Sequence, residues 1–170
     1  MFGITPFGMF HTVIALIAVA AGFTALAKYR EIGMATVSGR TYVLLTIVTC
    51  VTGLFIFRHG TFGIPHALAV LTLIVLFLAI AAEKRAAFGR LSRYVAVVGY
   101  SATLFFHMIP GFTETATRIP EGAPLASGPD DPGLRAAVGA AFIVFLIGAA
   151  LQVCRIRREK GLAVPSSAVA

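Results

Sequence analysis

Five apolar stretches, each roughly 20 residues long, dominate this sequence and carry almost no charged side chain. A helix of that length crosses a hydrocarbon core of about 30 Å, because each residue adds about 1.5 Å along a helix axis. Charged residues make up only 12% of the chain, which is about half the share usual in soluble domains. The sequence therefore predicts an all-α, polytopic membrane helical bundle with five transmembrane helices and no separate soluble domain.

Local signals indicate where each span begins and ends. Three spans are expected to start at a proline, which the first helical turn tolerates: Thr5-Pro6, Ile64-Pro65 and Asp131-Pro132. Ser38 or Thr41 can cap the second span, Ser92 can cap the fourth, and Pro110-Gly111 is expected to end the fourth. The predicted spans cover about residues 6–28, 41–58, 65–83, 93–109 and 132–154.

The basic residues predict the orientation of these spans. Of the fourteen lysines and arginines, eleven fall on one side of the predicted membrane: Lys28, Arg30, Arg40, Lys84, Arg85, Arg90, Arg93, Arg155, Arg157, Arg158 and Lys160. Because basic residues concentrate in cytoplasmic loops, the N-terminus is predicted outside and the C-terminus inside. Residues 1–161 then form one membrane domain with an outer loop at 111–131, and 162–170 form a flexible cytoplasmic tail.

Composition also bears on partners and location. The net charge of +7 does not predict nucleic-acid binding, because the basic residues flank apolar helices and form no long solvated patch. The lipid bilayer is the expected partner. Abundant alanine, glycine and arginine, with no tryptophan or asparagine, indicate a GC-rich bacterial genome. We therefore expect a multi-pass protein of the bacterial inner (cytoplasmic) membrane.

All four histidines of the chain fall at the predicted outer end, on four different helices: His11, His59, His66 and His107. Their depths should agree within roughly 8 Å. Small or polar residues share the helical faces of His11, His59 and His107, which predicts that these three point into the bundle. The face of His66 is more apolar and leaves its direction open. Ionisable residues within a membrane are costly to bury and are commonly functional.

Two kinds of ligand fit such a cluster. Haem b needs two facing imidazoles and cations for its propionates; Arg58 and Arg118 would serve as the cations, with Tyr100 on the same helical face as His107. A bare transition metal (Cu, Zn or Fe) would instead be bound by the four histidines with Glu114 as a carboxylate partner. The sequence leaves this choice open.

The leading hypothesis is a histidine-rich haem or metal site at the periplasmic end, used in redox and electron transfer or in metal handling. The fifth span carries no histidine, which leaves a non-catalytic accessory subunit of a larger membrane complex, or a homo-oligomer, as alternatives. A metal-dependent quinone- or lipid-modifying enzyme is a third hypothesis, and whether the chain is an enzyme stays open. A transmembrane proton path is disfavoured, because the inner half lacks carboxylates and Glu83 lies at its boundary beside Lys84.

Overall fold

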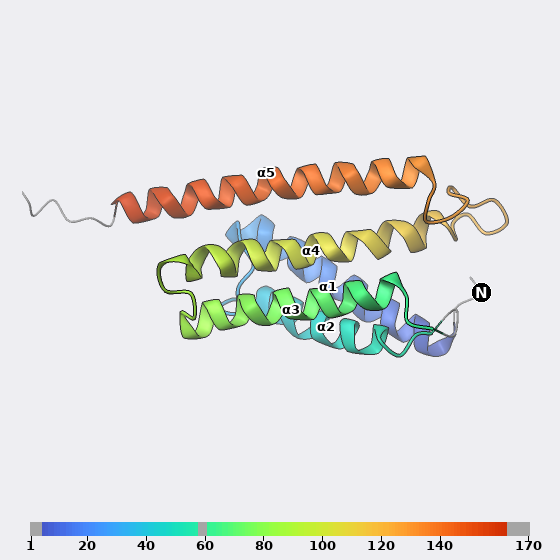
Figure 1. The fold of residues 1–170 in the computed structure, drawn as a ribbon, viewed down its shortest axis with the longest axis horizontal. Coiled ribbons are helices and arrows are strands. Elements are labelled where there is room, and N and C mark those ends of the chain that lie inside the picture. Colours follow the sequence, from blue (N-terminus) through green and yellow to red (C-terminus); the bar gives the residue numbers. More distant parts are fainter. Residues whose placement is uncertain (1–4, 58–60, 163–170) are drawn as a thin grey trace, which may run out of the picture.

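The computed structural model describes residues 5–57 and 61–162, with side chains up to residue 160, and these residues form helices and no β-strand. The elements are α1 (Pro6–Tyr29), α2 (Val37–Gly53), α3 (Ile64–Arg85), the 3₁₀ turn η1 (Gly89–Leu91), α4 (Ser92–Ala116) and α5 (Pro132–Leu162). Four α-helices are long and apolar enough to cross a membrane, and α2 is apolar but only 17 residues long. The all-helical prediction is confirmed, and the helices indicate a multi-pass membrane protein (Figure 1).

Helices α1 and α5 begin where the sequence predicts. The hydroxyl of Thr5 accepts the N–H of Gly8 at 3.1 Å, and Pro6 occupies the first turn. At the start of α5 the carboxylate of Asp131 accepts the N–H of Gly133 at 2.9 Å. Both caps satisfy N–H groups that a helix leaves unpaired at its start.

Helix α2 differs from the prediction at both ends. It begins at Val37 because the hydroxyl of Thr36 accepts the N–H of Gly39 at 3.1 Å, so neither Ser38 nor Thr41 is the cap. It ends at Gly53 rather than at residue 58. Glycine is a weak helix former, and this glycine lies against α1.

Helix α4 does not end at Pro110-Gly111 as predicted; it continues through Pro110 to Ala116. A proline within a helix removes one backbone hydrogen bond, and the following turn has another contact because the hydroxyl of Thr113 donates to the carbonyl of Ile109 at 2.8 Å. Helix α5 also extends beyond its predicted end at residue 154, through a segment rich in arginine, glutamate and lysine, which are good helix formers.

Helix α4 is the most central element and α5 the most peripheral. By close approach of their backbones, helix α4 packs against α1, α3 and α5, α5 packs against α4 alone among the described helices, and α2 packs against α1 and α3 (Figure 1). Side chains of α2 also reach α4, and side chains of α5 reach the end of α1 and the loop after it. In the most apolar part of each helix, 39% of residues are buried in α4 but only 6% in α5. Residues spaced three or four apart form the buried stripe of α4: Ser92, Ala96, Tyr100, Thr103 and His107. The exposed faces of α5 are apolar and therefore suited to lipid.

Small residues bring α1 close to its neighbours. Ala18, Gly22 and Ala25 are buried along one face of α1, the same face that carries His11. A Cβ atom at Gly22 would lie 2.9 Å from the ring of Tyr42. Close helix packing in membranes uses such small residues.

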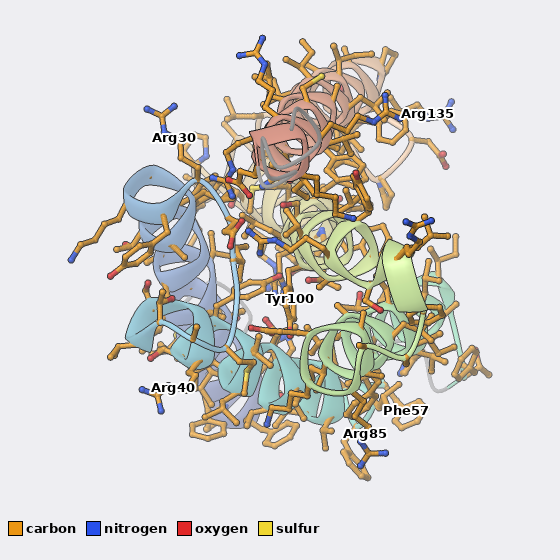
Figure 2. The ribbon with its side chains drawn as sticks, turned by 90° about the vertical axis from the view of Figure 1, so that its left-hand side faces the viewer. Arg30, Arg40, Phe57, Arg85, Tyr100 and Arg135 are labelled. Atoms are coloured by element: carbon orange, nitrogen blue, oxygen red, sulfur yellow. The ribbon has the colours of Figure 1, made fainter. Side chains whose placement is uncertain are left out.

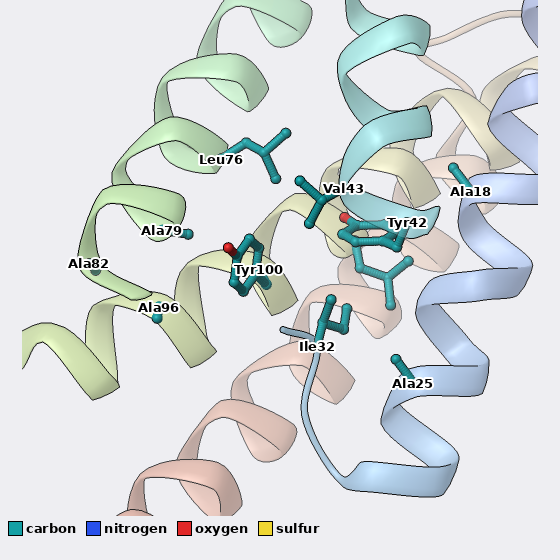
Figure 3. Close-up of a cluster of buried hydrophobic side chains, with 11 residues drawn as sticks. Ala18, Ala25, Ile32, Tyr42, Val43, Leu76, Ala79, Ala82, Ala96 and Tyr100 are labelled. Atoms are coloured by element: carbon teal, nitrogen blue, oxygen red, sulfur yellow. The ribbon is translucent and has the colours of Figure 1, made fainter. Parts of the chain in front are cut away.

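The loop between α1 and α2 enters the bundle. Ile32 is only 1% exposed and reaches from this loop toward Tyr42 and Tyr100 (Figure 3). The loop also presses on the start of α2, since a Cβ atom at Gly39 would lie 1.9 Å from the carbonyl oxygen of Gly33. Only glycine fits at position 39, so the loop and α2 are locked together.

Candidate functional site

His11 is the first of two histidines that helix α2 holds in a fixed orientation. Its Nδ1 lies 2.9 Å from the hydroxyl of Thr52. That hydroxyl also lies within hydrogen-bond distance of the carbonyls of Val48 and Thr49, at 2.8 and 3.1 Å. The tautomer of His11 with its proton on Nδ1 satisfies this arrangement, because the hydroxyl can then accept from His11 and donate to a carbonyl. In the neutral imidazole the other nitrogen, Nε2, then carries a lone pair and can bind a metal or accept a proton.

His107 is the second of these histidines and is buried in the bundle. Its Nε2 lies 3.0 Å from the hydroxyl of Thr46, one and a half turns from Thr52 on α2. Its ring meets that of Tyr42 edge-on, with 6.0 Å between the centroids. The imidazoles of His107 and His11 lie close enough to interact electrostatically. Helix α2 thus holds two of the four predicted histidines, each through one threonine hydroxyl.

Glu114 and Arg118, two further predicted site residues, lie beyond His107 near the end of α4. The carboxylate of Glu114 interacts electrostatically with the imidazole of His11 and forms an ion pair with Arg118 one helical turn later. Arg118 is therefore held by Glu114. The two remaining outer candidates, Arg58 and His59, lie outside the described residues.

His66 has a structural contact of its own. Its Nδ1 accepts the N–H of Gly63 at 3.1 Å and closes the first turn of α3. Its ring stacks against Phe57 and lies near Phe62, with centroid distances of 4.7 and 5.2 Å. It is buried, and no described contact joins it to His11 or His107. Its imidazole therefore acts as a helix cap within an aromatic pocket.

Few side chains at the histidine end of the bundle can bind a metal ion. Within residues 5–57 and 61–160, no three histidine, cysteine, aspartate or glutamate side chains are grouped closely enough to hold a metal ion. His11 offers Nε2, whereas His107 has Nε2 bonded to Thr46 and retains Nδ1. Nδ1 lies next to the carbon that joins the ring to the helix, so it suits a small ion better than a broad macrocycle such as haem.

Hydroxyl groups continue the polar interior below His107. The hydroxyl of Tyr42 lies 2.7 Å from that of Thr103 and also interacts with that of Thr46. Thr103 in turn donates its proton to the carbonyl of Tyr100 at 2.8 Å, so Tyr42 is the donor to Thr103. A carbonyl has no proton to pass on. Among the described residues, the polar groups that run from His107 therefore end at this carbonyl and form no continuous proton path.

Tyr100 belongs to a second polar set that faces the opposite end of the bundle. Its hydroxyl donates to Glu83 at 2.6 Å, and the second carboxylate oxygen of Glu83 accepts the N–H of Met34 at 2.8 Å. Viewed from this end, Tyr100 lies near the centre of the bundle, while Arg30 and Arg40 project from its periphery (Figure 2). Glu83 lies in the last turn of α3, next to Lys84, as the sequence predicts, and is exposed, but its carboxylate bonds the buried Tyr100.

A network of charges ties α5 to this second end. Glu31 forms a bidentate pair with Arg93, at 2.8 and 2.9 Å, and also pairs with Arg155 of α5. Glu159 lies 3.7 Å from Arg93 and 3.3 Å from Arg155. The two carboxylates and two guanidinium groups thus compensate one another between the first loop, α4 and α5.

Gln152 adds a neutral link to this network. Its side chain accepts from the hydroxyl of Ser101 at 3.0 Å and donates to the carbonyl of Arg30 at 3.1 Å. An amide in an otherwise apolar helix signals such an interhelical bond. The sequence indicates the role of Thr46 and Thr52 less clearly than that of Gln152, because threonines at these positions are equally typical of ordinary helix packing.

No protein-family model matches this sequence, and no curated protein or solved structure shows significant similarity to it.

Proposed function

We propose that this chain is a multi-pass protein of a bacterial inner membrane that handles a transition-metal ion at a two-histidine site on its periplasmic end. In this proposal the chain crosses the bilayer five times, with the N-terminus outside and the C-terminus inside. Helix α2, at 17 residues, reaches the lower limit of a spanning helix. The eleven basic residues on one side support the orientation.

The observation that carries the metal proposal is the orientation of His11. Metal-binding histidines usually donate one ring N–H to a fixed acceptor, which orients the other nitrogen toward the metal. His11 has this arrangement, with Thr52 as the acceptor on Nδ1. His107 is fixed by a hydroxyl of the same helix. Both imidazoles are therefore held in defined orientations by α2, and in this proposal they share one ion.

A small ion is better supported than haem b. Imidazole nitrogens suit Cu, Zn, Fe and Ni. An ion can reach the Nδ1 of His107, whereas a macrocycle at this nitrogen would meet α4, the helix that carries His107. Two protein nitrogens leave coordination positions for water or an exchangeable ligand. Such an open site suits acquisition or transfer of a metal rather than permanent storage.

Metal analysis of the purified full-length protein tests this proposal. After equilibration with Cu or Zn and removal of free metal, we expect about one bound ion per chain and no Soret band in the visible spectrum. His11→Ala and His107→Ala should each lower the bound metal at least tenfold. His66→Asn, which retains a capping acceptor for α3, is the matched control and should bind metal normally. A Soret band that either alanine variant removes would favour haem instead.

The orientation has an independent test. A reporter active only in the periplasm should be inactive when fused after Gly161 and active when fused in the loop between α4 and α5. The opposite pattern would place the histidines on the cytoplasmic side and remove periplasmic metal handling.

An accessory role is a second candidate function, and the packing of α5 favours it. The backbone of helix α5 approaches that of α4 alone among the described helices, and exposed apolar side chains run along α5 from Phe142 to Leu151. A partner subunit could cover this surface in place of lipid. Affinity purification from the native membrane, followed by native electrophoresis, should then yield a stoichiometric larger complex. A metal-free chain recovered in such a complex would favour the accessory role.

A further inference from the structure

A cavity of about 700 Å³ opens at the end of the bundle opposite the histidines. This volume falls in the range of pockets that bind small organic molecules. Its walls come from the loop after α1, the end of α3, and the start of α4, with Lys160 of α5 at the edge. Small and apolar side chains form much of the lining: Ile32, Ala35, Ala82, Ala86, Ala96 and Val97.

One acidic group in this cavity has only neutral partners. Glu83 accepts hydrogen bonds from the hydroxyl of Tyr100 and the N–H of Met34. These bonds fix its exposed carboxylate in place, and among the described residues no cation forms an ion pair with it. A fixed, unpaired carboxylate in a cavity wall is complementary to an ammonium group.

Two basic groups in the same cavity also lack an acidic partner. The guanidinium of Arg90 has no described carboxylate within ion-pair distance, and the ammonium of Lys160 bonds the carbonyl of Arg90 at 3.0 Å. The other charged lining residues, Glu31 and Arg93, pair with each other. The unpaired charges of the cavity are therefore one carboxylate and two cations, which together complement a ligand that carries both signs.

We propose that this cavity binds a zwitterion that carries a primary ammonium and a phosphate, the chemistry of a phosphoethanolamine group. Glu83 accepts from the ammonium, while Arg90 and Lys160 bind the phosphate. The apolar walls accept the carbon chain that joins them. This chemistry has two sources, the headgroup of a phosphatidylethanolamine in the bilayer and free phosphoethanolamine in solution. The site is independent of the proposed metal site, which lies at the other end.

Lipid titration of the full-length protein in detergent, read by native mass spectrometry, tests the proposal. The probes are phosphatidylethanolamine, phosphatidylcholine and phosphatidylglycerol with identical acyl chains. The choline group has no N–H to donate to Glu83, and the glycerol group has no positive charge. We expect phosphatidylethanolamine to bind at least tenfold more tightly than the other two. Equal binding of all three would overturn the proposal.

Variants locate the site. Glu83→Gln keeps an oxygen that accepts the N–H of Met34 and gains an amide that can donate to the hydroxyl of Tyr100. It removes the charge and should weaken phosphatidylethanolamine binding at least tenfold. Arg90→Gln, at an exposed side chain, should weaken it at least threefold and serves if the first variant fails to fold. Glu121→Gln, in the loop at the other end, is the control and should bind normally. Binding unchanged in both Glu83→Gln and Arg90→Gln would overturn the assignment.

Calorimetry with soluble phosphoethanolamine distinguishes the two sources. Binding that Glu83→Gln abolishes supports the site and shows that the free headgroup is sufficient. Binding of the lipid alone supports the site with the bilayer as source. Binding of neither overturns the proposal.

Discussion

The two ends of this helix bundle hold their polar groups in different ways. At the histidine end, neutral hydroxyls of α2 hold the imidazoles of His11 and His107. At the opposite end, Glu31 and Glu159 hold Arg93 and Arg155 by charge, next to a cavity. Neutral hydrogen bonds contribute about 1 kcal/mol each and keep their partners oriented. Ion pairs depend on their partners' charges and on salt.

The difference indicates separate tasks. Neutral hydroxyls orient the two imidazoles without placing an opposite charge beside them, so the imidazoles stay available to an external ligand. The charged network, by contrast, closes α5 onto the first loop. Among the charged residues that line the cavity, it leaves Glu83, Arg90 and Lys160 without an opposite charge. One end therefore presents nitrogen donors, and the other presents a cavity of mixed charge. Three substitutions and one pH titration, ordered by expected effect, test how far this contrast extends.

The largest effect is expected from Gly39→Ala at the charged end. The new Cβ would overlap the carbonyl of Gly33 at 1.9 Å, and backbone atoms cannot move aside as a flexible side chain can. We expect a loss of about 3 kcal/mol or more in the free energy of unfolding, measured by thermal unfolding in detergent. Gly111→Ala, which meets no atom within 4 Å at the other end, is the control. Equal melting of the two variants would show that the loop is not locked.

Glu31→Gln should have the next largest effect, because it leaves Arg93 and Arg155 without the carboxylate they share. We expect a loss of about 1–2 kcal/mol, since these side chains are partly exposed and solvent screens them. Thermal unfolding at low and high salt measures it, and high salt should narrow the difference from the parent chain. Asp130→Asn, in an exposed ion pair with Arg135, should change little. A salt-independent loss would contradict the ionic origin.

Thr46→Val tests the neutral end. Valine fills the same space but leaves Nε2 of His107 without its partner, which should cost about 1 kcal/mol. The matched control is Thr49→Val one turn away, whose buried hydroxyl has no hydrogen-bond partner, so its removal should be neutral or stabilising. Thermal unfolding of the two variants in parallel measures the difference. Equal effects would mean that the hydroxyl does not hold the histidine.

The smallest effect concerns the start of α5. Hydrogen bonds from the N–H groups of Ser127 and Gly133 lower the pKa of the Asp131 carboxyl below its ordinary value. The ionised carboxylate of Asp131 therefore stabilises the start of α5 when the pH is above the ordinary pKa of an aspartate. This stabilisation is lost as the pH falls through the lowered pKa. An NMR titration of the carboxyl in the intact protein should give a midpoint below that of an unstructured aspartate. An unshifted midpoint would contradict the cap.

Much of the architecture follows from the sequence alone. Apolar length and the caps at Thr5 and Asp131 predicted the number and approximate positions of the helices, because these signals act within a few residues. The same local reasoning placed the end of α4 at Pro110, where the helix in fact continues. It could not settle this boundary because a proline lowers helix stability without forbidding a helix when the surrounding turns persist.

Only the tertiary structure decided what each end holds. The hydroxyl partners of His11 and His107 lie 41 and 61 residues away in sequence. A small rotation of α2 about its axis would place other side chains opposite the two histidines. The pairing of Glu83 with Tyr100, and the cavity around it, likewise depends on how the first loop enters the bundle. Hydropathy determines that a helix is buried in a membrane. The side chains it turns toward its neighbours are fixed by packing among helices that are distant in sequence.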